Sequence, residues 1–488
     1  MKRIVTPLIL LFILAINLLS CDGLDENYST NPSHRLSFSV DTLSFDTVFT
    51  TIGSATKEFM IYNQNDKPLL ITDIMLAGAN ATGFRINVDG RKGDYFHDIR
   101  IGANDSLYVL AEVTVDPNSS NQPLLIDDSI IFTVNGLKQT VILEAFGQNV
   151  NLYKGGTFLT KDTELKAERP YLIYDSLIID KGVTIKIEPG ALFYMHDKAK
   201  IINHGTLLAN GKRDAPIIFR GDRLDFILND VLPYDRTPSQ WGGIFFGAES
   251  FDNILDYVII RNGQTGLTLE ESTPDKSKVK ISNSQITNMG GNLFWAFNCN
   301  AEITNTELTN AGDSVVALLG GKYTFIHCTI ANYITLAKRT YACLTLANNA
   351  DKKTFPLDAT FENCIIDGSF SAGKNQYAGE ISLSNEEGTA FNYYFNHCVI
   401  KSKGENNSNF NEVLFTEKSP SFRYLGGEKN KYVFDFRPDS ATTLGVGKAD
   451  IFVTQKYPID RYGINRLTNN GPDIGAYEFV PAEDDKDK

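Results

Sequence analysis

The sequence predicts an all-β protein in which a small β-sandwich precedes a parallel β-helix. Two observations predict this fold class. Between residues 35 and 150, apolar and polar residues alternate in short runs that turn-forming residues separate, which is typical of half-buried antiparallel strands. Beyond residue 155, a six-residue pattern recurs with a base spacing of 22 residues, a period in the range of solenoid repeats. We therefore expect two domains of different architecture.

The composition limits the classes of protein and of partner. The 488 residues are 42% hydrophobic and 22% charged, ordinary values for a soluble globular protein. These values exclude a disordered chain, a disulfide-dense mini-protein and a polytopic membrane protein. The 59 acidic residues outnumber the 46 basic ones, giving a net charge of -13. Nucleic acid is therefore not expected as a partner, because phosphate binding requires a basic face.

The N-terminus predicts export and a membrane anchor. Lys2 and Arg3 precede an apolar run over 8–19, which is too short to span a bilayer but suits a signal peptide. The run ends in Leu-Leu-Ser-Cys at 18–21, which resembles a bacterial lipobox and implies a signal peptide over 1–20 and lipid attachment at Cys21. The alternative is an ordinary cleaved signal with an incidental cysteine.

The residues after the cysteine bear on location. The acidic stretch at 22–26 resembles the surface-export signals of lipoproteins from Bacteroidetes. This resemblance implies an outer-membrane lipoprotein that is exposed at the cell surface, the alternative being one that faces the periplasm. Residues 21–34 are polar, and we expect them to form a linker between the membrane and the folded part.

The first domain, over 35–150, is predicted to be an immunoglobulin-like (Ig-like) sandwich. It holds about seven alternating runs, and the Asn135-Gly136 pair between two of them favours a two-residue hairpin turn. The runs at 43–48, 58–71 and 141–148 resemble the bacterial Ig-like domains of the ASPM/SPD-2/Hydin group, which implies a spacer or adhesion module. No catalytic cluster stands out in this stretch.

The second domain carries the repeated hexamer. Its apolar positions are the first, fourth and sixth, so the alternation loses one residue of phase at the third position, where the strand should bend. Asn or His occupies that position, and Asn tolerates the left-handed conformation that a bend requires. We expect stacked coils to align these residues in a hydrogen-bonded ladder of Asn283, Asn305, His327, Asn363 and His397. The cysteines that follow His327 and His397 are expected to be core thiols.

Two resemblances extend this interpretation. The segments 177–195, 200–211, 214–221 and 240–244 resemble the right-handed parallel β-helix of pectate-lyase-like surface lipoproteins, over about 155–479. Near the end, Asp460, Gly463, Arg466 and the Asp473–Glu478 run resemble the choice-of-anchor Q ending of surface β-helix proteins. We expect Asp460, Arg466, Asp473 and Glu478 to form a cap on the last coil. Residues 480–488 are expected to be a disordered tail.

The sequence leaves three functions open. We favour a non-catalytic protein that presents a β-helix for binding a glycan or a surface protein. The alternative is a polysaccharide lyase or glycoside hydrolase, although the coils lack the paired acidic motif of polygalacturonases. The third is a purely structural surface protein. No metal or cofactor is expected, except that calcium could bind the long excursion before Trp241, which carries Asp222, Asp225, Asp230 and Asp235 with Arg223 and Arg236.

Candidate binding residues lie where the coils lengthen. The last two hexamer spacings are 36 and 34 residues, which places 14 and 12 extra residues within 331–358 and 370–392. Loops that project from a rigid stack are where such scaffolds place binding sites. The candidate ligand-binding residues there are Tyr333, Arg339, Tyr341, Lys374 and Tyr377.

Overall fold

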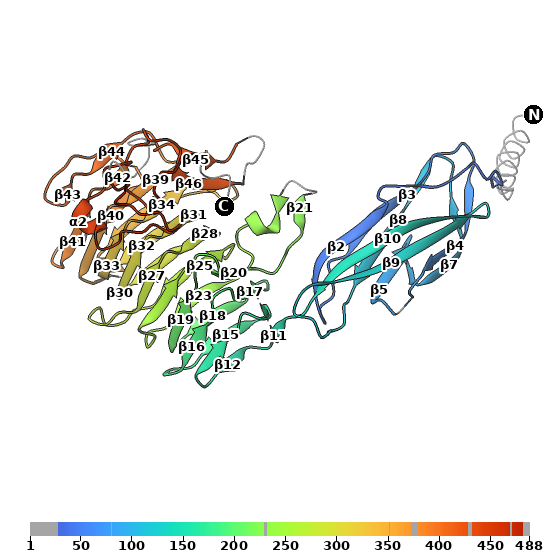
Figure 1. Ribbon diagram of the computed structural model, residues 1–488, viewed down its shortest axis with the longest axis horizontal. Coiled ribbons are helices and arrows are strands. Elements are labelled where there is room, and N and C mark those ends of the chain that lie inside the picture. Colours follow the sequence, from blue (N-terminus) through green and yellow to red (C-terminus); the bar gives the residue numbers. More distant parts are fainter. Residues whose placement is uncertain are drawn as a thin grey trace, which may run out of the picture. The chain divides into compact units, whose positions relative to one another are not determined.

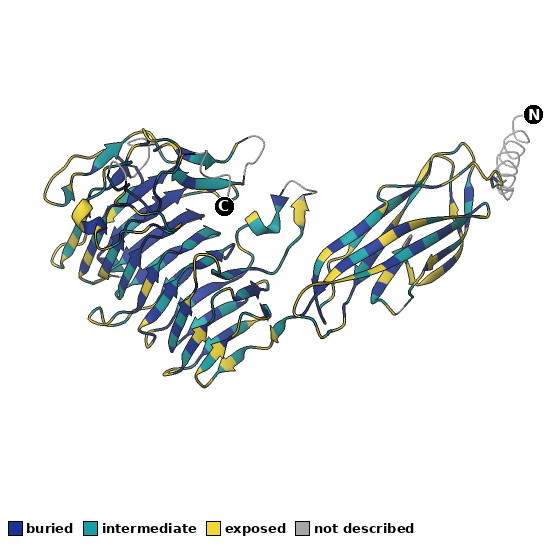
Figure 2. Ribbon diagram, viewed as in Figure 1, coloured by how far each residue is buried: buried dark blue, intermediate teal, exposed yellow. Residues whose placement is uncertain are grey.

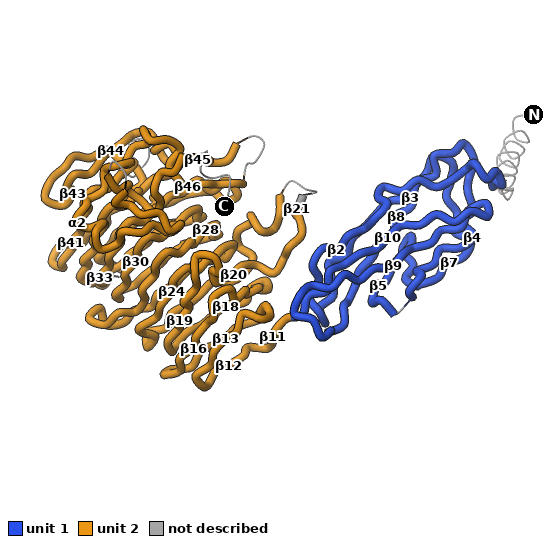
Figure 3. Tube along the Cα trace, viewed as in Figure 1, with its two compact units in different colours: residues 1–149 blue, residues 150–488 orange. Residues whose placement is uncertain are grey.

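The computed structural model of the protein describes residues 28–79, 81–228, 232–350, 352–371, 379–427, 432–468 and 471–481. The signal peptide, Cys21 and most of the acidic tail therefore lie outside the described residues. The chain divides into two compact units at residues 149 and 150, coloured separately in Figure 3. We call residues 1–149 unit 1 and residues 150–488 unit 2. Across the described stretches, no helix combines the length and the apolar character that crossing a membrane requires.

Unit 1 consists of two five-stranded sheets. Ten strands form, more than the seven or so expected, because short strands such as β1 and β6 have too few residues to show an alternating pattern. The β9–β10 hairpin turns at Asn135 and Gly136, both with positive φ, as the sequence indicates. All pairs are antiparallel except β2 with β10. The first sheet is ordered β1 (Ser37–Phe38), β3 (Lys57–Asn63), β8 (Asp105–Val113), β5 (Phe84–Val88), β6 (Arg91–Gly93), and the second β2 (Thr42–Phe49), β10 (Leu137–Gln148), β9 (Leu124–Val134), β4 (Leu69–Leu76), β7 (Tyr95–Ile101).

The core of unit 1 lies between these sheets. Alternate residues of each strand point inward, for example Phe59 and Ile61 on β3 and Phe132 on β9, all at most 1% exposed. The structure describes residues 28–34 of the expected linker, and these residues do not form a free tether. There the Ser29 N–H donates to the Pro68 carbonyl at 2.9 Å, so these residues lie on unit 1 rather than forming a free tether.

Unit 2 is built from three parallel sheets, which we call S1, S2 and S3. Successive strands pass from S1 to S2 to S3 and then begin the next coil, as the stacked strands of Figure 1 show. This all-β arrangement with long parallel sheets is consistent with a β-helix. S1 contains β11 (Asn151–Tyr153), β14 (Tyr171–Ile173), β17 (Leu192–Met195), β20 (Ile217–Gly221), β25 (Val258–Arg261), β28 (Gln285–Met289), β31 (Glu307–Ala311), β34 (Thr329–Asn332), β39 (Ile365–Gly368), β42 (Val399–Lys401) and β44 (Leu414–Thr416).

The other two sheets run alongside S1. S2 contains β12 (Thr157–Leu159), β15 (Ser176–Ile179), β18 (Lys200–Asn203), β23 (Gly243–Phe246), β26 (Leu267–Leu269), β29 (Phe294–Phe297), β32 (Val316–Leu319), β35 (Leu344–Ala347) and β40 (Ile381–Ser384). S3 contains β13 (Thr163–Leu165), β16 (Thr184–Ile187), β19 (Thr206–Asn210), β24 (Asn253–Asp256), β27 (Val279–Ser282), β30 (Asn300–Thr304), β33 (Gly321–Ile326), β38 (Leu357–Glu362), β41 (Phe391–Asn396) and β43 (Phe410–Asn411).

Shorter elements lie outside the three sheets. Within the described residues, three two-stranded pairs and two single-turn helices occur in the connections and in the C-terminal segment. They are β21 (Phe226–Leu228) with β22 (Leu232–Pro233), the 3-10 helix η1 (Tyr234–Arg236), β36 (Asn349–Ala350) with β37 (Lys353–Thr354), β45 (Phe422–Leu425) with β46 (Phe434–Pro438), and α2 (Ile451–Thr454).

The hexamer marks the corner between S3 and S1. In the copy at 281–286, Ile281 lies near the end of β27 and Ile286 lies in β28, so the Asn283 position turns the chain from one sheet to the next. The third residue of all five copies has positive φ: 48° at Asn283, 47° at Asn305, 50° at His327, 54° at Asn363 and 49° at His397. The lost residue of phase thus coincides with a left-handed residue at the corner, as expected.

Apolar side chains fill the interior of unit 2. The strands of the stack are largely buried in Figure 2, and the phenylalanines of S3 stack coil on coil. The ring centroids of Phe325 and Phe361 are 4.9 Å apart, and those of Phe361 and Phe395 are 4.7 Å apart. The five described cysteines are buried free thiols, as expected: Cys299, Cys328, Cys343, Cys364 and Cys398.

The described part of the C-terminal segment covers a side of the stack rather than its end. We call residues 421–480 the C-terminal cover. The expected end cap is therefore wrong in position, although its residues do pack against the stack. The outer face of S1 carries apolar side chains in the later coils, and burying them requires a covering layer. The small cluster at this contact comprises Ala331, Ile365 and Val399 of S1 with Phe422, Phe436 and Ile474 of the cover.

Candidate functional site

Arg339 ties two projecting segments together. Its guanidinium donates to Glu380 Oε2 at 2.7 Å, and the two side chains are 4% and 0% exposed. It also donates to Ser369 Oγ at 2.9 Å and lies over the Phe370 ring. Glu380 further accepts the Cys343 N–H at 3.1 Å. Buried and engaged by these partners, Arg339 joins the segment after β34 to the segment before β40 and is not free to bind a ligand.

Tyr333 belongs to a second buried network. Its hydroxyl bonds to Asp367 and Ser419, and the Lys401 ammonium donates to Ser419 Oγ at 3.0 Å and to the Gly368 carbonyl. Burial raises the pKa of Asp367 to about 6, while the Tyr333 hydrogen bond and the Lys401 charge act to lower it. Asp367 Oδ1 is buried without a hydrogen-bond partner. The network fastens the chain at 419 to the outer face of S1.

The five candidate binding residues therefore do not converge on one site. The side chains of Tyr333 and Arg339 are engaged in hydrogen bonds and an ion pair inside unit 2. The expectation that they contact a ligand is therefore wrong. Tyr341 is 49% exposed and remains accessible. Lys374 and Tyr377 lie outside the described residues. Sequence alone did not separate these roles, because the partners Glu380 and Asp367 lie 41 and 34 residues away.

The acidic excursion before Trp241 forms ion pairs rather than one cation site. Asp225 pairs with Arg223 at 2.5 Å, and Asp235 lies 3.0 Å from both Arg220 and Arg261. Asp222 bonds to a histidine on another coil. Because these carboxylates point to separate partners, the described part of the excursion does not gather the oxygen ligands that calcium needs. Arg236 ends helix η1, and Asp230 lies outside the described residues.

An aromatic pair stands at the corner after S1. Tyr174 follows β14 and His196 follows β17, one coil later, and their rings stack with centroids 4.0 Å apart. His196 Nδ1 lies 2.6 Å from Asp222 Oδ2, and the Lys154 ammonium sits 5.2 Å from the Tyr174 ring centre. Burial raises the pKa of Asp222, while the histidine acts to lower it. The His196 side chain is 38% exposed, so the group is partly open to solvent beside the charges of Lys154 and Asp222.

This pair was not predicted from the sequence. Tyr174 and His196 are separated by 22 residues, the base spacing of the coils, and each comes directly after the last residue of a strand of S1. The same spacing that predicted the hexamer corners could therefore have identified them. The hexamer begins only at residue 255, so the earlier coils lack a repeated motif that shows which of their residues stand at equivalent positions.

The four residues expected to form the cap make a buried polar cluster in the C-terminal cover. Arg466 donates to Glu478 Oε1 at 2.8 Å and to Asn305 Oδ1 of the stack at 3.1 Å. Asp460 accepts the N–H groups of three residues, and Asp473 accepts those of Gly447 and Phe479. Burial raises the pKa of Glu478 in spite of the Arg466 charge. These contacts hold the cover closed on itself and onto a corner of the stack.

The Asn/His ladder is interrupted where the cover meets it. Asn305 Nδ2 bonds to Asn283 at 3.3 Å, and Asn363 Nδ2 bonds to His327 at 3.1 Å. Between these pairs the corner residues bond to the cover instead, Asn305 to the Ile459 carbonyl and His327 to Thr454. His397 pairs with its neighbour Asn396. The continuous ladder expected from the sequence is thus wrong, because the cover takes some of its hydrogen bonds.

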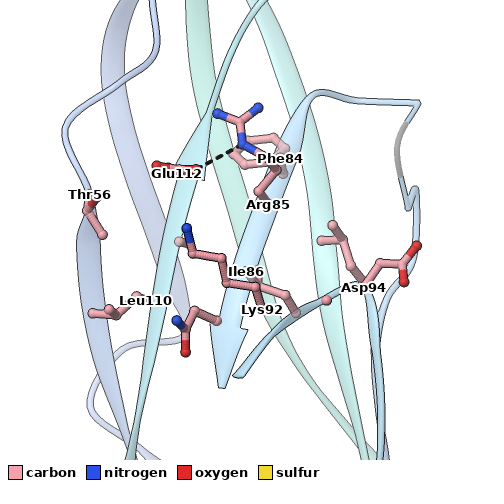
Figure 4. A pocket seen from close by; sticks show the side chains of 12 residues that line it. Thr56, Phe84, Arg85, Ile86, Lys92, Asp94, Leu110 and Glu112 are labelled. Atoms are coloured by element: carbon pink, nitrogen blue, oxygen red, sulfur yellow. Dashed lines mark hydrogen bonds and ion pairs between the residues drawn. The ribbon is translucent and has the colours of Figure 1, made fainter. Parts of the chain in front are cut away.

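Unit 1 contains a pocket that was not predicted from the sequence. It measures about 640 Å³ and lies against β5, β6 and β8 (Figure 4). Arg85 and Glu112 form an ion pair of 2.9 Å at one side, and Lys92 lies on another strand. Asn87 also lines the pocket, and its Oδ1 is buried without a hydrogen-bond partner. Because β6 is only three residues long, it pairs with Ile86–Val88 and leaves the edge of β5 unpaired at Phe84 and Arg85.

Comparisons with known proteins give no family for this chain. No protein-family model matches it, and no curated protein matches it. Among solved structures, a family 123 glycoside hydrolase from Clostridium perfringens is 11% identical with a TM-score of 0.18, the match covering 24% of this chain and 27% of the hydrolase. PapD-like domain 7 of human CEP192 is 12% identical (TM-score 0.17; 26% and 94% covered). The E. coli chaperone DraB is 11% identical (TM-score 0.17; 24% and 55% covered). This chain thus spans about a quarter of the length of the hydrolase.

Proposed function

We propose that this protein is a lipid-anchored lipoprotein of the Bacteroidetes type, held in the outer membrane and exposed at the cell surface. Its Ig-like unit 1 acts as a spacer, and its right-handed parallel β-helix binds a glycan or a surface protein without catalysis. The N-terminal run, the lipobox at Cys21 and the acidic residues after it support the anchor and the location. The choice-of-anchor Q-like ending supports a surface protein.

The lipid anchor has a direct test. The wild-type chain is expected to incorporate labelled palmitate and to sediment with outer membranes, since several acyl chains anchor a protein stably. Cys21→Ser removes the acceptor thiol and should abolish both. Cys299→Ser is the matched control, because this thiol is buried in unit 2. Labelling of Cys21→Ser at the wild-type level would contradict lipid attachment at this residue.

The Tyr174–His196 pair is the observation that carries glycan binding. A partly exposed aromatic pair beside charged side chains suits a sugar, which presents apolar C–H groups and hydroxyl groups. On a glycan array, Tyr174→Ala is expected to lower the affinity for any bound glycan about tenfold or more. Tyr394→Ala on S3, where the side chain is 36% exposed, should leave binding unchanged. Equal loss in both variants would place the glycan elsewhere.

The His196–Asp222 pair favours one alternative function, a polysaccharide lyase or hydrolase. A carboxylic acid of raised pKa beside a histidine is a common arrangement for proton transfer. A reducing-end assay on the chain from residue 22 decides between the two functions. Turnover that Asp222→Asn abolishes would establish the enzyme, whereas binding without turnover supports the proposal. If the chain shows neither glycan binding nor turnover, the purely structural surface protein is the remaining function.

A further inference from the structure

The solenoid ends with a strand missing from one sheet. Nine coils contribute one strand each to S1, S2 and S3, ending with β39, β40 and β41. The tenth coil contributes β42 to S1 and β43 to S3, but no strand to S2. Residues 402–409, all of which the structure describes, connect β42 to β43 without pairing to β40 as a strand. No described residue thus occupies the position of a tenth S2 strand, which we call the vacant S2 position.

The edge of β40 presents main-chain groups to this position. On its paired side, the Leu344 N–H donates to the Glu380 carbonyl and the Asn348 N–H to the Ser384 carbonyl. In a parallel ladder, alternate residues of a strand bond to opposite neighbours. The N–H and C=O groups of Ile381 and Leu383 therefore point away from β35, and β40 pairs with β35 alone among the described strands.

An apolar row of S2 also ends uncovered at this edge. Leu318, Leu346 and Leu383 occupy one inward position in three consecutive coils. Leu318 and Leu346 are 0% exposed, because the next strand covers each of them, whereas Leu383 is 42% exposed. In every preceding coil of S2, the element that covers the inward row is another strand. The uncovered edge therefore has the main-chain groups and the apolar side chain that could bind a further strand.

A cavity of about 860 Å³ occupies the vacant position. The four residues of β40 form one wall, and residues 402–405 form part of the opposite wall. The Phe410 and Phe415 rings also line the cavity. Gly404 lies against the Phe415 ring so closely that a Cβ there would come within 2.3 Å of it. Lys403 and Glu405 provide charges of both signs beside it.

We propose that this vacant S2 position is a binding slot for an extended segment of another polypeptide. The segment pairs its main chain with Ile381 and Leu383 and continues S2 by one strand. Its alternate side chains are apolar where they cover Leu383 and contact the Phe410 and Phe415 rings. Its remaining side chains face outward and need not be apolar. The proposal depends neither on the lipid anchor nor on glycan binding at Tyr174, so each can fail without the other.

A peptide that copies β40 tests the slot. The probe is a fluorescein-labelled peptide of residues 379–386, GEISLSNE, which has apolar residues at alternate positions. Fluorescence anisotropy with the chain from residue 22 is expected to show saturable binding. Leu383→Asp places a charge in the slot and should weaken binding about tenfold or more. Leu152→Asp makes the same change at a leucine on β11 that is 38% exposed and far from the slot in the stack. It is the matched control and should change the affinity less than about twofold.

Two further measurements test how the peptide binds and whether the slot accepts a second copy of this chain. A control peptide with asparagine in place of both apolar residues is expected not to bind. Equal binding of the two peptides, or equal affinity of Leu383→Asp and the wild type, would overturn the proposal. Sedimentation velocity of the chain without peptide provides the second readout. Self-association that Leu383→Asp abolishes would also overturn the proposal, since the slot would then hold a second copy of this chain. Leu383 is 42% exposed, so the variant should fold, which circular dichroism checks.

Discussion

Arg466→Ala is expected to lower the free energy of unfolding of unit 2 by about 3–5 kcal/mol. The Arg466 side chain is 0% exposed and forms the buried ion pair with Glu478. Without it, the Glu478 carboxylate remains buried with no cation beside it, and Asn305 loses one of its two hydrogen bonds to the cover. Both tryptophans, Trp241 and Trp295, lie in unit 2, so their fluorescence during a urea titration reports this unit alone.

The matched control is an ion pair at the surface of the same unit. Lys166 bonds to Glu164 and Glu188 but is 52% exposed, and Lys166→Ala should leave the unfolding midpoint nearly unchanged. Limited proteolysis gives a second readout, because loss of Arg466 should expose the C-terminal cover to cleavage before the stack unfolds. Midpoints and cleavage rates that agree between Arg466→Ala and Lys166→Ala would show that the buried pair does not hold the cover.

The repeated parts of unit 2 could be predicted from the sequence because they depend on residues that are close in the chain or one coil apart. The place of a corner in the chain, as at Asn283, follows from the left-handed backbone of that residue and from the apolar residues on either side. The same holds for the Asn135-Gly136 hairpin of unit 1, which needs only two residues of positive φ. These features follow from local sterics and from the period of the pattern.

The parts that could not be predicted depend on contacts between distant segments. Arg466 meets Asn305 across 161 residues, and Arg339 meets Glu380 across 41. A pattern with a period of 22 carries no information about which face a non-repeating segment will cover. One signal was present: Ile365 and Val399 are apolar at positions that face outward in S1, and an outward apolar row requires a cover. The interrupted ladder follows from the same contact.

The free energy of unfolding of unit 2 is expected to fall as the pH rises, because the carboxyl group of Asp367 is buried. Burial raises its pKa from the usual 3.8 to about 6, so between these values the folded state binds the proton more tightly than the unfolded state. Stability from this group is therefore fully present below about pH 4 and is lost as the pH rises through about 6. At about 1.4 kcal/mol per pH unit, the loss amounts to about 3 kcal/mol.

Asp367→Asn isolates this effect, since every other group titrates alike in both proteins. The amide keeps an oxygen for the Tyr333 hydroxyl but cannot ionise. We expect the stability of Asp367→Asn relative to the wild type to rise by about 3 kcal/mol between pH 4 and pH 7, in urea titrations followed by tryptophan fluorescence. Asp358→Asn, at an exposed site on β38 of the same unit, should show no such trend. The opposite slope would mean that the Lys401 ammonium outweighs burial and holds the pKa of Asp367 low. In that case the network at Tyr333 would be an ion pair that strengthens as the pH rises.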